Sequence, residues 1–328
     1  MSEETRQAVF DTEALRRLED IASVDPDLLV TDFTDPSGAA RRSLHEAEVL
    51  LTGWGCPPLD HEALRRMPAL DAVVHAAGSV KHHITEACWQ RGIAVTTAAA
   101  ANALPVAEYT LAAILFANKR VLEGAQAYRD RRDRVALLSL FPGVGNYRRT
   151  VGLVGASRIG RRVAELLKPF DLHVLMHDPY LDAAVAHELG VEPADLDTLV
   201  TRSDIVSLHA PELPATRGLF DAARLSLMPD GATLINTARG SLVDTEALTK
   251  EVRTGRLHAV LDHTEPQVLP ADSPLYTLPN VLLTPHLAGS IGGELHRLAD
   301  AAIDEIRRYA SGLPFRHRVD PTTLAHSA

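Results

Sequence analysis

The amino-acid sequence predicts an α/β protein with two domains, each built on a parallel sheet that helices cover on both faces. The chain has 328 residues, which exceeds the ~100–200 residues of a typical single domain. From about residue 150, short apolar strands alternate with amphipathic helices. A similar but separate alternation precedes this region, and a long apolar segment joins the two parts.

The N-terminal part contains three short apolar runs that are typical of buried strands. These runs are Glu48–Trp54, Leu70–Gly78 and Ile93–Ala98. A long apolar helix is expected next, over Pro105–Ala125, with Pro105 in its first turn, where a backbone N–H is not needed. We expect this helix to link the two domains.

The second part contains six further runs that predict strands, with helical segments between most of them. These are Thr150–Gly155, Leu172–Asp178, Asp204–Ala210, Ala232–Ala238, Leu257–Asp262 and Asn280–His286. A last helix is expected from about Gly293 to Ala310, because Ser311, Gly312 and Pro314 form a stop signal.

Composition limits the possible functions. Hydrophobic residues make up 46% and charged residues 23%, as in folded globular enzymes. The polar, acidic start predicts no signal peptide, no apolar run reaches the ~20 residues of a membrane helix, and Cys56 and Cys88 form no CxxC motif. The net charge of −10 without a basic stripe argues against nucleic acid. We therefore expect a cytoplasmic protein with neither a nucleic-acid nor a membrane partner.

A glycine-rich motif, Gly155–Gly160 (GASRIG), lies between a predicted strand and a predicted helix. In the G-x-G-x-x-G pattern, the glycines permit a tight turn, approach of the backbone to a pyrophosphate, and close packing of helix on strand. Ser157 replaces the middle glycine, and its hydroxyl is small enough to fit and to bond a phosphate oxygen. Asp178 ends the next strand, where a carboxylate accepts both ribose hydroxyls of NAD and repels a 2′-phosphate.

Three other segments follow predicted strands, at the edge where open α/β sheets bind ligands. They are Asn236–Gly240 (NTARG), Leu261–Gln267 (LDHTEPQ) and Thr284–Ser290 (TPHLAGS). They supply an arginine that can grip a carboxylate, a histidine that can move a proton, and groups that can orient the histidine. His209 and His263 also end strands, either lining a cofactor or capping the strand.

These motifs together resemble the D-isomer-specific 2-hydroxyacid dehydrogenase family, which includes phosphoglycerate, glyoxylate/hydroxypyruvate, D-lactate, phosphite and formate dehydrogenases. The similarity spans roughly residues 45–320. Besides the motifs above, it is carried by TGWG, AAGSVKHH, NALPVAE, HDPYL, SLHAP and LDHTEPQVLPADSPLY, all in the family's order and spacing.

The resemblance implies two Rossmann-like, doubly wound domains with the active site in a cleft. The flavodoxin-like substrate domain would comprise residues 1–118 and 297–328, and the NAD-binding domain residues 119–296. The family's catalytic arginine falls on Arg239 and its acid–base histidine on His286. NAD is the implied cofactor, and no metal is expected.

The resemblance also assigns binding residues. The loop that holds the substrate carboxylate matches Gly78, Ser79 and Val80, and Asn102 matches a substrate-positioning asparagine of formate dehydrogenases. The implied cofactor contacts are Ser157, Arg158, Ile159, Gly160, Asp178, His209, Pro211, Thr216, Thr237, Ala238, Asp262 and Thr110.

The chain departs from the family pattern at the partner of the catalytic histidine. The family's glutamate lies five residues after the aspartate that ends its strand, and Gln267 occupies this position after Asp262. Glu265 lies two residues earlier and is the rival partner. A second departure is the start of the chain: residues 1–8 are too polar for the first strand of the family, so either that strand is lost or the true start lies upstream.

The leading hypothesis is an NAD-dependent oxidoreductase that interconverts a 2-oxo acid and a D-2-hydroxy acid. One alternative is oxidation of formate or another small anion with a His–Gln pair. Another is a nucleotide-sensing scaffold without catalysis. The sequence identifies neither the acid nor the preferred direction. The segment Leu122–Arg149 carries an apolar run that an isologous homodimer would bury, as in related enzymes.

Overall fold

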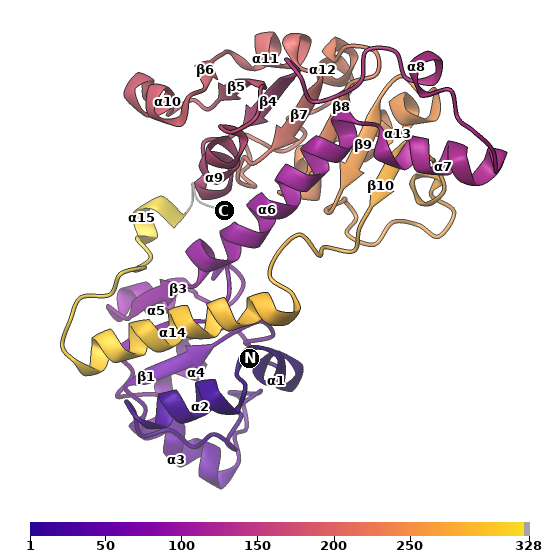
Figure 1. Cartoon of the computed structure of the whole chain (residues 1–328). Helices are drawn as coiled ribbons and strands as arrows, with labels where there is room; N and C mark the ends of the chain where they lie inside the picture. Colours follow the sequence, from indigo (N-terminus) through magenta and orange to yellow (C-terminus); the bar gives the residue numbers. More distant parts are fainter. Residues whose placement is uncertain (325–328) are drawn as a thin grey trace. The chain divides into compact units, whose positions relative to one another are not determined.

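The computed structural model describes residues 1–324, which divide into two compact units (Figure 1). Within the described residues, unit 1 comprises Met1–Asn102 and residues 290–324, and unit 2 comprises Ala103–Gly289. Both contain parallel sheets with helices, so the predicted α/β class is confirmed.

The compact units divide earlier along the chain than the boundaries expected after residues 118 and 296. The physical reason lies in α6 (Ala99–Asn118), whose residues Ala107, Ala113 and Ile114 pack in a core of unit 2. The substrate domain was expected to include residues 297–328. The last four of these, residues 325–328, lie outside the residues that the structure describes.

Unit 1 is built on a three-stranded parallel sheet with the order β1-β2-β3. The strands are β1 (Val49–Thr52), β2 (Ala72–His75) and β3 (Ala94–Thr97). Neighbouring side chains of β2 enter different cores, because successive residues of a strand point to opposite faces. Val73 packs in the cluster that contains Leu59, and Val74 packs in the cluster that contains Leu298 and Ile303.

Helices cover this sheet, and α14 packs against β2 (Figure 1). The helices of unit 1 are α1 (Glu3–Val9), α2 (Thr12–Glu19), α3 (Gly38–Glu46), α4 (His61–Arg65), α5 (Glu86–Gln90), α14 (Leu295–Ala310) and α15 (Pro321–Leu324), with a short η3 turn (Gly292–Glu294). The expected last helix is thus α14, preceded by the η3 turn.

The polar start of the chain forms a helix rather than a strand. The hydroxyl of Ser2 caps α1 by accepting a hydrogen bond from the amide of Thr5 at 3.1 Å. The amide of Ser2 donates to the carbonyl of Trp54, and Val9 and Phe10 are buried. These contacts attach the segment to the end of β1.

Unit 2 is built on a seven-stranded parallel sheet with the order β10-β9-β8-β7-β4-β5-β6. The strands are β4 (Thr150–Val154), β5 (His173–His177), β6 (Glu192–Pro193), β7 (Ile205–Leu208), β8 (Thr233–Asn236), β9 (His258–Leu261) and β10 (Val281–Leu283). The chain builds outward from β4 to β6 and then crosses to β7 on the other side of β4. This reversal creates the switch point beside which open α/β sheets bind ligands.

In unit 2, two helices that follow α6 precede the first strand, and the other helices lie between successive strands. They are α7 (Val121–Arg131), α8 (Leu137–Leu140), α9 (Arg158–Leu167), α10 (Ala183–Leu189), α11 (Leu196–Arg202), α12 (Ala222–Leu227) and α13 (Thr245–Arg253), with η1 (Gly240–Leu242) and η2 (Pro274–Tyr276). Two cores lie on opposite faces of the sheet, since Leu234 packs in one and its neighbour Ile235 in the other.

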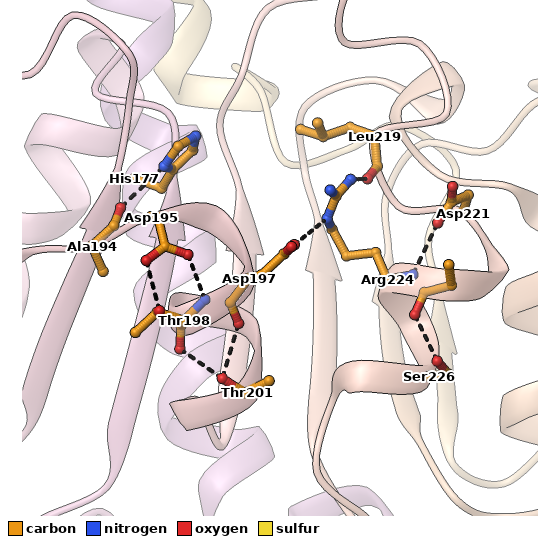
Figure 2. A network of polar contacts seen from close by, with 11 residues as sticks. His177, Ala194, Asp195, Asp197, Thr198, Thr201, Leu219, Asp221, Arg224 and Ser226 are labelled. Carbon is orange, nitrogen blue, oxygen red and sulfur yellow. Dashed lines mark hydrogen bonds and ion pairs between the residues drawn. The ribbon is translucent and has the colours of Figure 1, made fainter.

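A network of polar contacts fixes two of these helices (Figure 2). Asp195 caps α11, because one of its carboxylate oxygens accepts from the amide of Thr198 at 2.9 Å and the other accepts from the Thr198 hydroxyl. Asp197 then binds the guanidinium of Arg224, on α12, at 3.1 Å. The cap satisfies one of the amides that a helix N-terminus leaves unpaired.

The predicted helix Pro105–Ala125 is wrong in two respects. The helix begins earlier, at Ala99, so Pro105 lies inside α6 rather than in its first turn. It also ends at Asn118, because Arg120 adopts a left-handed backbone conformation (φ 52°) before α7 begins. By length and composition alone α6 could span a membrane, but Ile114 is buried among strand residues of unit 2, as in the core helix of a soluble protein.

Candidate active site

The glycine loop of unit 2 requires glycine at both ends. Gly155 follows β4 with φ +105°, and a Cβ there would lie 2.6 Å from the amide nitrogen of Ala210. A Cβ on Gly160 would lie 2.0 Å from the carbonyl oxygen of Gly155. Any larger residue at either position would therefore push α9 or the strand ends apart.

Ser157, the departure from the glycine pattern, serves as the N-cap of α9. Its hydroxyl accepts from the amide of Gly160 at 3.3 Å. Arg158, Ile159 and Gly160 occupy the first turn, and the amides of this turn that the Ser157 cap leaves unpaired favour an anion. The close glycine packing and this helix start fit a dinucleotide pyrophosphate.

Asp178 lies just after β5, as predicted for a residue that binds ribose. One carboxylate oxygen accepts from the amide of Ala156 at 2.7 Å and the other from the amide of Tyr180 at 2.8 Å. A carboxylate offers about four acceptor positions, so two remain for ribose hydroxyls. The first contact also ties Asp178 to the glycine loop.

The ends of β7 and β8 carry further predicted cofactor residues. His209 is buried, burial lowers its pKa to about 3, and its Nε2 contacts the Ser207 hydroxyl at 3.0 Å. Thr237, after β8, and Thr110, on α6, are both buried, and their hydroxyl oxygens lie 3.1 Å apart, within hydrogen-bond distance. His209 is therefore a neutral hydrogen-bonding group at physiological pH.

Thr216 makes contacts that close a turn. Its hydroxyl donates to the carbonyl of Pro211 at 2.6 Å and accepts from the amide of Leu213 at 2.9 Å. These contacts hold the loop after β7 in shape, and the cofactor contacts that the resemblance implies for Thr216 and Pro211 stay a prediction.

Arg239 follows β8 in a segment that Asn236 holds in shape. The Asn236 amide donates to the carbonyl of Arg239 at 2.8 Å and accepts from the amide of Ala238 at 3.1 Å. The Arg239 guanidinium donates to the Ala238 carbonyl at 2.7 Å, and burial lowers its pKa while nearby Glu212 opposes the shift. An arginine remains charged under such conditions, so it can still bind a carboxylate.

Asp262 fixes the loop that carries His286. The two carboxylate oxygens of this buried residue accept from the amides of Leu287 at 2.8 Å and Ala288 at 3.0 Å. The Thr284 hydroxyl donates to Asp262 at 2.7 Å, and Tyr109 contacts Thr284 at 3.1 Å. Side chains and backbone groups therefore converge on the residues flanking His286.

This loop also corrects the expected strand Asn280–His286, since β10 ends at Leu283. His286 has a left-handed backbone conformation with φ 57°, which is uncommon outside glycine. The backbone thus turns at His286, and its side chain is exposed on unit 2 rather than embedded in the sheet.

Gln267 is the side chain that contacts the His286 ring edge. The amide nitrogen of Gln267 lies 3.4 Å from Nδ1 of His286, whereas Glu265 forms an ion pair with Arg217 at 2.5 Å. This geometry favours Gln267 over Glu265 as the histidine partner. Although His286 is exposed, the surrounding protein partly desolvates its ring, and this is the chief cause that lowers the pKa of His286; Arg239 adds to the shift and the Asp262 charge opposes it.

Unit 1 brings together the four residues predicted to bind substrate. The amides of Gly78, Ser79 and Val80 donate no hydrogen bond to any residue within the described range 1–324. A Cβ on Gly78 would lie 3.6 Å from the side-chain nitrogen of Asn102, whose oxygen accepts from the amide of Ser290 at 3.1 Å. Free amides in a loop are suited to a carboxylate.

Sequence reasoning missed Tyr109. It lies on the apolar helix α6, where no motif distinguishes it, and its role depends on the contact with Thr284, 175 positions further along the chain. Within the described part of the chain, no group of three or more His, Cys, Asp or Glu side chains is arranged to hold a metal ion.

Comparison with known proteins places these features in context. A family model described as D-isomer specific 2-hydroxyacid dehydrogenase, NAD binding domain, matches residues 111–288. The D-3-phosphoglycerate dehydrogenase of Mycobacterium leprae is 36% identical over 270 residues, which is 81% of this chain and 50% of that protein. The glyoxylate reductase of Aeropyrum pernix is 34% identical over 261 residues, 77% of each chain.

Solved structures share the fold. The TT0316 protein from Thermus thermophilus superposes with a TM-score of 0.76 and 32% identity, covering 95% of this chain and 98% of that one. The present chain spans about half the length of the phosphoglycerate dehydrogenase that it matches.

Proposed function

Because this chain belongs to the D-isomer specific 2-hydroxyacid dehydrogenase family, we propose that it is an NAD-dependent oxidoreductase that interconverts a 2-oxo acid and a D-2-hydroxy acid. The observation that carries this proposal is the arrangement around His286. Its loop is tied to Asp262, its ring edge contacts Gln267, and Arg239 is close enough to affect its pKa. The M. leprae and A. pernix proteins, named for such reactions, support the same class of chemistry.

In this proposal, Arg239 and His286 have separate roles in the reaction. Arg239 binds the substrate carboxylate and polarises the carbonyl, because its planar guanidinium donates in a fork. His286, when protonated, donates a proton to the carbonyl oxygen during reduction and accepts it during oxidation. NAD, when bound, would supply the hydride chemistry, and the glycine loop and Asp178 would hold it. Separately, we propose that the free amides of the Gly78–Val80 loop in unit 1 form a carboxylate-binding site.

Gln267 suits a histidine that changes charge. With the Gln267 amide oxygen turned toward the ring, it accepts from Nδ1–H in both the neutral and the protonated imidazole, which leaves Nε2 to exchange the proton with the substrate. A glutamine can therefore orient both states of His286, whereas a carboxylate would favour the charged one.

The test is NADH oxidation with glyoxylate, hydroxypyruvate, pyruvate and bulkier 2-oxo acids, with wild type and His286→Asn compared. We expect turnover with at least one acid and its loss, by ~10²-fold or more, in the variant. Wild-type protein that binds NADH but turns over none of the panel would overturn the proposal and favour a nucleotide-sensing scaffold.

We further propose that NAD is preferred over NADP. Asp178 supports this, because its carboxylate lies at the end of β5 and is joined to the glycine loop through Ala156. A 2′-phosphate bound beside it would be repelled. Comparison of kcat/KM for NADH and NADPH with the best substrate tests this preference, and equal values would contradict it.

A second candidate function is oxidation of formate or a similar small anion. The contact between Gln267 and His286 favours it, because the family resemblance associates a His–Gln pair with formate dehydrogenases. No proton is transferred to the substrate in such a reaction, so its rate would not require protonated His286. Formate with NAD⁺ belongs in the same assay panel.

We also propose that the protein works as a homodimer in the cytoplasm. In unit 2, the side chains of α8 are strongly exposed for apolar residues, with Leu137 58% and Leu138 94% accessible. An apolar pocket lined by Phe116 and Leu122 lies between α6, α7 and the strands β8 to β10. A second copy would cover such surface, since monomers rarely expose large apolar patches.

A further inference from the structure

A second histidine lies against the candidate acid–base residue. His263 follows β9 immediately after Asp262, and its ring centroid is 3.8 Å from that of His286, with the ring planes inclined by 58°. Gln267 contacts the edge of the same imidazole at Nδ1. The His286 ring thus has Gln267 at Nδ1 and a second imidazole, tilted by 58°, packed closely against it.

These two contacts restrict a side chain that would otherwise turn freely. The χ2 torsion of histidine is broad, and His286 is exposed and lies on a turn with positive φ. The 3.4 Å contact to Gln267 is long for a hydrogen bond and leaves rotation about that contact possible. A ring packed this closely against the imidazole restricts this freedom.

We propose that His263 is a positioning residue, which holds the imidazole of His286 in the orientation needed for proton transfer. The inference rests on the proposed function, because it assigns the proton transfer to His286. Misplacing a reacting group by about 1 Å can cost ~10²-fold in rate, so such a contact has a measurable effect.

The charges around the pair indicate how His263 acts. Besides His286, the charged groups that influence it are Arg239, Asp262 and Glu212. Burial, followed by His286 and Arg239, lowers the pKa of His263 to about 4, against the opposing influence of the two carboxylates. His263 therefore stays neutral while His286 titrates, and the pair carries one proton, on His286.

A neutral ring that acts by contact should be replaceable by another neutral ring. His263→Phe keeps an aromatic face and cannot titrate, whereas His263→Ala removes the face. We expect His263→Ala to lower kcat for 2-oxo acid reduction about tenfold or more and His263→Phe to stay within about threefold of wild type. The KM for NADH should change less than about twofold in both variants. The exposed histidine of α10 provides the matched control, His187→Ala.

The pH profile separates positioning from loss of stability. Removing the ring exposes His286 to water, so its pKa should rise toward the ordinary ~6.5 in His263→Ala and remain lowered in His263→Phe. The basic limb of the pH profile of kcat/KM for reduction would then move to higher pH although kcat falls. Partial unfolding does not produce this combination. An unchanged kcat and limb in His263→Ala, or equal damage in His263→Phe, would overturn the proposal.

NMR titration of the histidine Cε1–H signals makes the test independent of activity. If wild type reduces no 2-oxo acid, the proposed function fails, while the His286 signal still reports whether His263 contacts it. In that case, a His286 pKa that is the same in wild type and His263→Ala would overturn the contact itself. If His263→Ala does not fold, the wild-type and His263→Phe titrations decide, and a His286 pKa that differs between them by more than about half a unit would refute the neutral-ring role.

Discussion

The identity of the histidine partner can be tested by restoring a charge. In Gln267→Glu, a carboxylate would lie near the present 3.4 Å separation from Nδ1 of His286. At this distance, attraction between unit charges is about 1.2 kcal/mol in water and about 5 kcal/mol at an effective dielectric constant of ~20. One pKa unit corresponds to ~1.4 kcal/mol, so these two energies would raise the pKa of His286 by about 1 unit and about 3.5 units, respectively. Both side chains are exposed, so we expect the lower limit, a rise of about one unit.

The sign of the pH effect follows from the state that each direction requires. Reduction needs protonated His286, whose pKa is lowered in wild type, so reduction should decline as the pH rises through that pKa. Gln267→Glu should move this basic limb of kcat/KM upward by about one unit, and raise the rate up to about tenfold at a pH above both limbs. Oxidation needs the neutral ring and should persist to high pH in wild type.

Glu265→Gln is the matched control, because it removes the carboxylate that pairs with Arg217 at 2.5 Å. We expect Glu265→Gln to leave the pH of the basic limb of kcat/KM for reduction unchanged. If Glu265→Gln lowers the limb and Gln267→Glu does not move it, the assignment of Gln267 is wrong and Glu265 is the partner.

Three further predictions concern cofactor choice, assembly and the glycine loop. Asp178→Asn should lower the NADH-to-NADPH ratio of kcat/KM about tenfold, since it removes the charge that repels a 2′-phosphate; an unchanged ratio would exclude that role. Light scattering at micromolar concentration should give a dimer for wild type and a monomer for Leu138→Asp, because Leu138 is 94% exposed in the single chain; a monomeric wild type refutes the dimer. Gly160→Ala should cost about 1–3 kcal/mol of stability and weaken NADH binding, whereas Gly293→Ala, whose Cβ meets nothing within 4 Å, should be neutral by thermal melting.

The strands and the strand-end motifs were predictable because their signals are local. β4 ends at Val154, directly before the glycine loop, and the apolar run of the sequence marks this strand almost residue for residue. Parallel strands bring their carboxyl ends to one edge, so residues after β8, β9 and β10 were expected to gather. Arg239, Gln267 and His286 do lie in one unit, although their catalytic roles stay predictions.

The features that sequence reasoning did not give depend on tertiary contacts. The left-handed Arg120 ends the apolar helix region early, while the sequence around it continues a helical pattern. Pro105 is tolerated inside α6, although proline removes one backbone hydrogen bond there. The contacts of Tyr109 with Thr284 and of His263 with His286 join residues whose proximity only the folded unit reveals.

Unit 1 contains a second pair of histidines, which predicts acid sensitivity. His75 and His83 are buried with ring centroids 4.4 Å apart, and the Nε2 atom of each has no hydrogen-bond partner among the described residues. Burial is the main cause that lowers the pKa of His75 to about 3 and of His83 to about 4. Both must therefore be neutral in the folded protein, whereas in the unfolded chain they accept protons below ~6.5.

The unfolded state of this unit binds more protons than the folded state between about pH 6.5 and 4, so acidification destabilises the fold. Each histidine should remove about 1.4 kcal/mol at pH 5.5, or about 3 kcal/mol for the pair. His83→Phe keeps an aromatic ring without titrating and should halve the loss attributable to the pair, whereas His82→Gln, at an exposed position, should not.

Urea unfolding at pH 7.5 and 5.5 measures the loss in the free energy of unfolding. Both tryptophans of the chain, Trp54 and Trp89, lie in unit 1, so their fluorescence follows that unit alone. An identical loss of stability in His83→Phe and wild type would show that the buried pair is not the cause.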